Sequence, residues 1–104
     1  ILETKEGETQ VTLKELAPVR LIKNKFYQDV QDLYAKCPTK EELATLLGRA
    51  RAKHGMFEGD LDEGELEIGQ IAGLIHAIKP AAEIISEMIT DYNLARKEVE
   101  KFDF

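Results

Sequence analysis

The residues best placed to contact a ligand are Gly69, Gln70 and Gly73, which lie within the run 65–78. Apolar residues recur at helical spacing through this run, at Ile68, Ile71, Leu74, Ile75 and Ile78. Two glycines four positions apart share one face of a helix, and each costs about 1 kcal/mol relative to alanine. The run therefore predicts a helix over 65–78, with a face that a backbone, a neighbouring helix or a flat ligand approaches closely.

A stretch rich in acidic residues leads into this run and invites comparison with cation sites: Glu58, Asp60, Asp62, Glu63 and Glu65. The EF-hand loop places oxygen ligands at alternating positions, with a glycine at its sixth position and a closing glutamate. The stretch has neither feature at the required spacing. We therefore predict no metal site and interpret residues 55–64 as a polar, turn-rich loop, whose negative charge favours the start of the following helix.

No grouping of residues in the sequence predicts nucleophilic catalysis. Such catalysis needs a nucleophile, a base and an orienting group that converge. His54 and His76 lie far apart in the sequence, and Ser86 and Cys37 fall on separate predicted helices with no evident base. We therefore predict no catalytic residue in this chain.

Two groups of basic residues are candidates for binding a phosphate, either of a nicotinamide cofactor or of the prosthetic group of a carrier protein. The first group is Arg20, Lys23 and Lys25, and the second is Arg49, Arg51 and Lys53. Spaced cations are also common on solvated surfaces, and the sequence has no glycine-rich phosphate loop. Both interpretations stay open at this point.

Composition limits the classes of function. The 104 residues are 43% hydrophobic and 33% charged, as in a single globular domain. A net charge of −6 argues against a nucleic-acid partner, because a phosphate backbone demands a basic surface. Polar residues interrupt the best apolar run, so we expect no membrane span. With no recognisable signal peptide and with Cys37 as the single cysteine, we expect a cytoplasmic protein. A chain that opens on Ile1 rather than on methionine fits a fragment.

The first part of the chain predicts short extended pieces. Polar and apolar residues alternate over 10–13, and 19–22 forms either a second short strand or a buried loop. From residue 24 the pattern becomes helical, because an asparagine that can cap a first turn precedes an apolar stripe. We expect this helix to end at Cys37-Pro38.

The remaining helices have clear start signals. Thr39 and Glu42 form a capping box, so a second helix starts there, and Gly48 either breaks it or is tolerated in a longer helix reaching residues 53–54. Pro80 fits the first turn of a last helix of about 20 residues, roughly 30 Å long. Its apolar stripe is Ala81, Ile84, Ile85, Met88, Ile89, Tyr92, Ala95 and Val99. The predicted fold is mainly α, a small assembly of about four helices with a short extended N-terminal segment, forming one domain over 1–104.

Two segments carry a resemblance to a known family. The run GMFEGDLDEGELEIGQIAGLIHAIKPAAEII, residues 55–85, resembles the C-terminal segment of the flavin-dependent nitronate monooxygenases (2-nitropropane dioxygenases) and type II enoyl-acyl-carrier-protein reductases. The run ELAPVRLIKNKF, residues 15–26, is similar to the segment that follows the last barrel strand in those proteins. Members of this family are FMN-dependent (β/α)8-barrel oxidoreductases about three times as long as this chain, so the resemblance implies that the barrel lies before Ile1.

The resemblance implies a parent enzyme that uses FMN and NAD(P)H. In the reductase branch it would reduce an enoyl thioester on an acyl carrier protein during fatty acid biosynthesis, and in the monooxygenase branch it would oxidise a small-molecule nitronate. Gly69 and Gln70 match the Gly-Gln pair at the start of the helix that returns toward the flavin, so they are the implied cofactor-binding residues. The glycine-rich phosphate loops and the catalytic histidine of the family belong to the barrel. We therefore expect the isolated chain to bind no cofactor and to be inactive, with the upstream barrel as its partner, and leave open whether the parent is a homodimer.

An alternative from another class is a free-standing helical module for protein interaction. It would use the helix that starts at Pro80 and the terminal aromatic residues Phe102 and Phe104 to dock into a groove of a partner.

Overall fold

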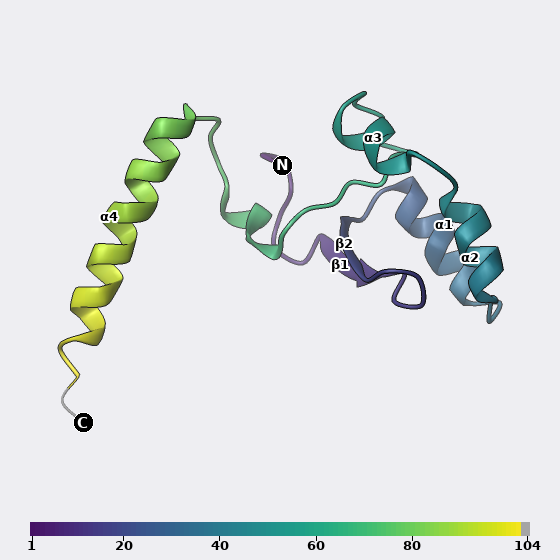
Figure 1. Cartoon of the computed structure of the whole chain (residues 1–104), viewed down its shortest axis with the longest axis horizontal. Helices are drawn as coiled ribbons and strands as arrows, with labels where there is room; N and C mark the ends of the chain where they lie inside the picture. The colour runs from purple at the N-terminus through teal and green to yellow at the C-terminus, as the bar shows by residue number, and fades with distance from the viewer. Residues whose placement is uncertain (103–104) are drawn as a thin grey trace.

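The computed structural model describes residues 1–102, which form a two-stranded sheet and a set of helices (Figure 1). In chain order the elements are β1 (Thr9–Thr12), β2 (Val19–Ile22), α1 (Lys25–Tyr34), α2 (Lys40–Leu47), α3 (Arg51–Met56), the 3-10 helix η1 (Gln70–Leu74) and α4 (Ala81–Val99). The prediction of a small, mainly α fold with an extended N-terminal segment is confirmed.

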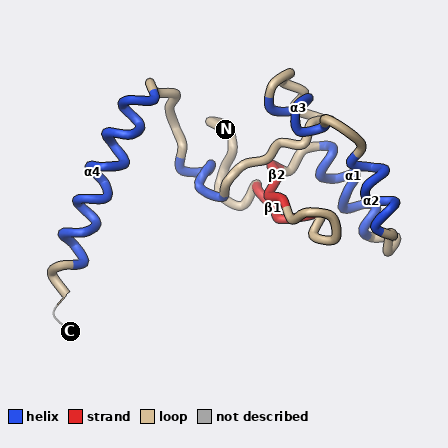
Figure 2. The backbone as a smooth tube through the Cα atoms, viewed as in Figure 1, coloured by secondary structure: helices blue, strands red, loops and turns tan. Residues whose placement is uncertain are grey.

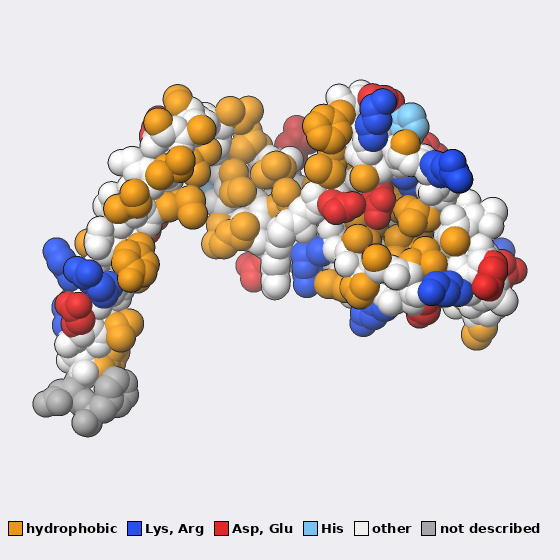
Figure 3. All heavy atoms as spheres, viewed as in Figure 1, with side chains coloured by type: hydrophobic (Ala, Val, Ile, Leu, Met, Phe, Trp, Pro, Cys, Tyr) orange, Lys and Arg blue, Asp and Glu red, His pale blue; other side chains and the backbone are white. Residues whose placement is uncertain are grey.

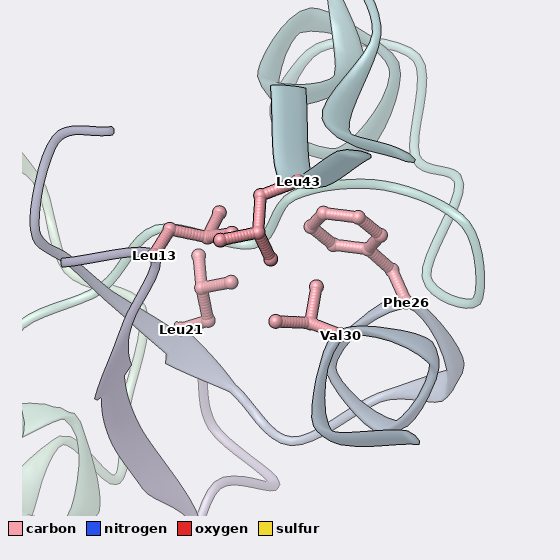
Figure 4. Packing of buried hydrophobic residues seen from close by; sticks show 5 residues of the cluster. All are labelled: Leu13, Leu21, Phe26, Val30 and Leu43. Atoms are coloured by element: carbon pink, nitrogen blue, oxygen red, sulfur yellow. The ribbon is translucent and has the colours of Figure 1, made fainter. Parts of the chain in front are cut away.

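The hydrophobic core lies between the hairpin and the first two helices. Within the described residues, its fully buried members come from the position directly after β1, from β2, from α1 and from α2, and their side chains point toward one another (Figure 4): Leu13, Leu21, Phe26, Val30 and Leu43. Burial of each such side chain contributes about 2 kcal/mol. This core fixes the hairpin against the pair α1 and α2.

Side-chain caps start the first two helices where the sequence predicts them. The Asn24 side chain accepts a hydrogen bond from the Tyr27 amide at 3.0 Å. Thr39 and Glu42 satisfy each other's backbone amides at 3.2 and 2.7 Å, as a capping box requires. Gly48 then ends α2 with φ of 66°, a left-handed conformation that suits glycine, so α2 and α3 are separate helices.

The strands β1 and β2 pair antiparallel, with Thr9 opposite Ile22 and Thr12 opposite Val19 (Figure 2). A later segment continues this pairing on the free side of β2. The Ile22 amide donates to the Leu66 carbonyl at 3.0 Å, and the Ile68 amide donates to the Arg20 carbonyl at 3.1 Å.

The predicted helix over 65–78 is wrong. Residues 66–68 are extended because their backbone groups bond to β2, which leaves them unavailable for a helical turn. Only Gln70–Leu74 closes into a 3-10 helix, and the chain then runs extended to Pro80 (Figure 2). Because no α-helix starts at residue 65, the expected favourable effect of the acidic stretch on a helix start does not apply.

The last helix, α4, starts directly after Pro80 as predicted and stands away from the rest of the molecule (Figure 1). None of its side chains is buried by another described part of the chain. The molecule consequently measures 52 × 36 × 20 Å, with a radius of gyration of 18.0 Å, against roughly 13 Å for a compact domain of this length.

Two glycines allow the loop after α3 to cross that helix at backbone contact. A Cβ placed on Gly64 would lie 2.3 Å from the Cα of Gly55 and 2.3 Å from the Asp60 carbonyl oxygen. Backbone atoms cannot yield as a flexible side chain can. Alanine at position 64 should therefore lower the free energy of unfolding by about 2 kcal/mol or more, measured by urea denaturation.

The matched control is Gly69→Ala, because a Cβ there meets only the Ile71 side chain, at 3.8 Å, among the described residues. We expect its unfolding midpoint to stay close to that of the unchanged chain. Equal stability of the two variants would contradict the crossing of Gly55 and Gly64.

Candidate functional site

The predicted cofactor-binding pair lies at the start of η1. Gly69 is extended, with φ of −74° and ψ of 157°, and its carbonyl accepts a hydrogen bond from the Ala72 amide at 3.1 Å. Ala72 is buried beneath the turn, whereas Gln70 is exposed. The turn therefore presents the Gln70 amide at the surface, on a short, hydrogen-bonded piece of backbone.

The predicted close approach to the glycine face holds for Gly73. A Cβ placed on Gly73 would lie 3.0 Å from the backbone nitrogen of Glu6 and 3.3 Å from its Cα. The approaching group is thus a backbone, one of the three possibilities that the sequence left open. Gly69 has free space beside it within the described chain, so packing in this chain does not explain a glycine there.

An open hollow of about 470 Å³ lies beside the turn, lined by Glu6, Gln70, Ile71, Gly73 and Leu74. Its walls are mostly apolar, and Gln70 and Glu6 are its polar residues. The Ile71 and Leu74 side chains are largely exposed. Apolar walls with a few polar groups are typical of small-molecule sites.

In the second basic group, Arg51 has a structural role. The Arg51 guanidinium lies over the Phe26 ring, 4.4 Å from its centroid. It donates to the Leu46, Leu47 and Glu63 carbonyls at 2.9, 2.8 and 2.8 Å. Arg51 thereby ties the end of α2 to the acidic loop, and most of its donors are already engaged.

The first basic group is likewise engaged with the chain itself. Arg20 donates to the carbonyl and hydroxyl oxygens of Thr9 at 3.3 and 3.1 Å, and Lys23 donates to the Gly7 carbonyl at 3.0 Å. Lys25 pairs with Asp29 and Glu63. The structure does not place either basic group among the residues that line the hollow beside Gln70.

The side chains considered for catalysis lie at separate places. His54 pairs with Glu58 across the C-terminal end of α3, and Cys37 is exposed after α1. His76 belongs to the extended connection before α4, and Ser86 lies on α4. Among residues 1–102, no three His, Cys, Asp or Glu side chains are grouped so as to hold a metal ion. No helix in the same part of the chain is long and apolar enough to cross a membrane.

Sequence reasoning missed the special environment of Glu65. It is only 7% exposed, and its amide donates to the Arg51 carbonyl at 3.1 Å. Burial raises the pKa of the Glu65 carboxyl, the charge of Glu67 raises this pKa further, and Arg51 lowers it. Alternation of polar and apolar residues over 65–68 fits an extended segment as well as a helix, but it does not indicate that the Glu65 side chain is buried.

Comparisons with solved structures identify a similar fold. The structure of FabK from Thermotoga maritima matches with a TM-score of 0.80 and 25% sequence identity, covering 95% of this chain and 31% of that chain. The M276A mutant of the same protein matches with a TM-score of 0.71 and 25% identity, covering 95% of this chain and 28% of that chain. The sequence matches no protein family profile and no curated protein.

These matches confirm the resemblance predicted from the sequence, because FabK is a type II enoyl-acyl-carrier-protein reductase, an FMN-dependent barrel enzyme. They also confirm the fold class, since the small helical assembly is similar to a part of FabK. This chain spans about a third of the length of the structures that it matches.

The raised pKa of Glu65 gives a pH dependence with a definite sign. The folded state binds the proton more tightly than the unfolded state, so stability falls as pH rises from the unfolded pKa through the folded pKa. Glu65→Gln should therefore be more stable than the unchanged chain at pH 7, and this advantage should vanish below about pH 4. Urea midpoints measured across this range test the prediction, with exposed Glu3→Gln as the control. A stability difference between Glu65→Gln and the unchanged chain that does not vary with pH would contradict this prediction.

Proposed function

We propose that this chain is the C-terminal helical portion of a cytoplasmic FMN- and NAD(P)H-dependent enoyl-acyl-carrier-protein reductase of the FabK kind, acting in fatty acid biosynthesis. The observation that carries the proposal is the match to FabK over 95% of this chain at a TM-score of 0.80. The two structures described above are both of FabK, which favours the reductase branch over the nitronate monooxygenases. The barrel that binds the flavin phosphate would come from the rest of the parent protein.

The residues around η1 fit the role of covering one side of a flavin. The hollow offers the apolar side chains of Ile71 and Leu74, as the faces of an aromatic ring system require. The Gln70 amide both donates and accepts hydrogen bonds, so it can pair with either kind of group on the ring edge. The open space beside Gly69 lets a ligand approach the backbone there.

The contribution of this chain to the reaction is positioning. Bound flavin would supply the hydride relay between the nicotinamide and the double bond of the enoyl thioester. Gln70 would orient a ring edge through its amide, and Gly69 would allow the close approach of the ring. Gly73 would fix the position of the turn, because it packs directly against the Glu6 backbone. Without the barrel the chain should not turn over substrate.

One observation favours the alternative of a free-standing interaction module. The apolar face of α4 is uncovered in the described structure, and Phe102 after it is 68% exposed. Phe104, the other aromatic residue of this hypothesis, lies outside the described residues. A module would bind a partner through α4 with no flavin involved.

Fluorescence titration of FMN tests the proposed function. We expect FMN to bind when the 104-residue chain is combined with the polypeptide encoded directly before Ile1, and not to bind the 104-residue chain alone. Gln70→Ala should weaken this binding about tenfold, which corresponds to the loss of one hydrogen bond to the ring.

The matched control is Gln28→Ala, an exposed glutamine on α1 that pairs with Asp32. We expect FMN affinity to be unchanged in this variant. An assembled pair that binds no FMN would overturn the flavin assignment, and equal affinities of both variants would remove Gln70 from the site.

A further inference from the structure

A separate hollow lies in the N-terminal half of the molecule, between the end of α2 and the acidic loop. It measures about 230 Å³, and we call it the arginine hollow. In Figure 3, Lys and Arg side chains lie on both sides of a His side chain over α3, at this end of the molecule. The residues that line the hollow include two members of the second basic group: Leu47, Gly48, Arg49, Arg51, His54, Asp60 and Glu63.

Arg49 is the cation of this hollow that the chain itself leaves unpaired. Its side chain is exposed and makes no hydrogen bond or ion pair within residues 1–102. The residues on either side, Gly48 and Ala50, have φ angles of 66° and 59°. A residue with a Cβ, such as Ala50, rarely adopts such an angle, and strained positions of this kind cluster at functional sites. The chain thus holds Arg49 in a strained turn, although no contact of its side chain in the described structure requires this turn.

Arg51 and His54 add further donors to the same hollow. Three of the five N–H groups of the Arg51 guanidinium bond to backbone carbonyls, which fixes its position and leaves the others available. The Nδ1 atom of His54 pairs with Glu58, so Nε2 is the ring nitrogen left for a ligand. Two side chains whose positions are set by the chain therefore stand beside the unpaired Arg49.

The two acidic residues of the arginine hollow are already engaged elsewhere. The Oδ1 atom of Asp60 accepts hydrogen bonds from the Asp62 and Glu63 amides at 3.2 and 2.9 Å. The Glu63 carboxylate pairs with Lys25 and also lies 3.7 Å from the Arg51 guanidinium. Neither carboxylate pairs with Arg49, so the positive charge of Arg49 stays available to an anion.

We propose that the arginine hollow binds a phosphate group through Arg49, with Arg51 and His54 as further donors. The planar fork of an arginine matches two phosphate oxygens at once. The hollow is smaller than the roughly 300–1,000 Å³ of sites that enclose a whole small molecule, so it suits one charged group whose remainder stays outside. The phosphates of a nicotinamide dinucleotide phosphate and of a carrier-protein prosthetic group share this chemistry. The inference goes beyond the proposed function, because it involves neither Gln70 nor a flavin.

Titration of the 104-residue chain with inorganic phosphate, followed by NMR, tests the proposal. Amide signals of residues 48–54 and 60–63 should shift and saturate, because these segments form the hollow. Arg49→Ala should weaken phosphate binding at least about tenfold, because it removes charge-assisted hydrogen bonds. The Arg49 side chain is exposed and has no partner in the described chain, so this variant should keep its fold.

The matched control is Lys36→Ala, which removes the same charge from another exposed side chain that has no partner among residues 1–102. We expect this variant to bind phosphate as tightly as the unchanged chain. An equal loss of affinity in both variants would overturn the proposal, because it would show only a general attraction of phosphate to positive charge. Shifts confined to residues outside the hollow would overturn it as well.

Two further probes distinguish the sources of the phosphate group. Adenosine 2′-monophosphate carries the phosphate of the nicotinamide cofactor, and 4′-phosphopantetheine carries that of the prosthetic group. The natural source is the one whose probe binds more tightly than inorganic phosphate and loses this affinity in Arg49→Ala. FMN titration of the chain assembled with its preceding polypeptide separates the two proposals. Phosphate binding that depends on Arg49, in an assembly that binds no FMN, would support the arginine hollow and overturn the flavin assignment. FMN binding by an assembly whose chain binds no phosphate would do the reverse.

Discussion

The position of the candidate site around Gln70 depends on the hydrogen bonds that hold residues 61–68 against the hairpin and the start of α1. The Asn24 side chain caps α1 and also donates to the Leu61 and Gly64 carbonyls at 3.0 and 2.8 Å. The Phe26 amide donates to the Asp62 carbonyl at 2.9 Å, and β2 holds the residues that follow. Since η1 comes directly after this segment, the place of Gln70 is set by contacts that involve no part of Gln70 itself.

Arg51 supports the same segment from the other side. Its guanidinium packs on the core ring of Phe26 and bonds to the Glu63 carbonyl, so the loop is held by a residue that sequence reasoning considered for phosphate binding. A guanidinium offers several donors in a fixed plane, which lets one side chain bond to three backbone carbonyls. The close passage of Gly64 over Gly55 completes this arrangement, because only hydrogen side chains leave room for it.

The two halves of the molecule differ in how they are stabilised. The hairpin, α1 and α2 share a closed core, with Leu13, Leu21 and Leu43 fully buried. Beyond η1 the chain has ion pairs but no comparable burial among the described residues. A helix held only by its own backbone bonds and a few ion pairs gains little stability. The C-terminal half is therefore stabilised mainly by local interactions, whereas the N-terminal half is stabilised by its core.

The sequence by itself determined the elements whose start and stop signals are local. Asn24, the Thr39 and Glu42 box and Pro80 mark helix starts through hydrogen bonds or backbone angles that involve nearby residues. For Gly48 the sequence left two alternatives, and the structure shows that it ends α2. Only the tertiary structure decided the course of residues 65–78, because their apolar spacing fits a helix, while β2 offers their backbone a better partner far away in the sequence. The tertiary structure likewise decided that Gly73 packs against the Glu6 backbone, that Arg51 packs on the core ring of Phe26 and that Glu65 is buried. Each of these contacts depends on which segments, distant in the sequence, pack together. The local spacing of residues does not predict that packing.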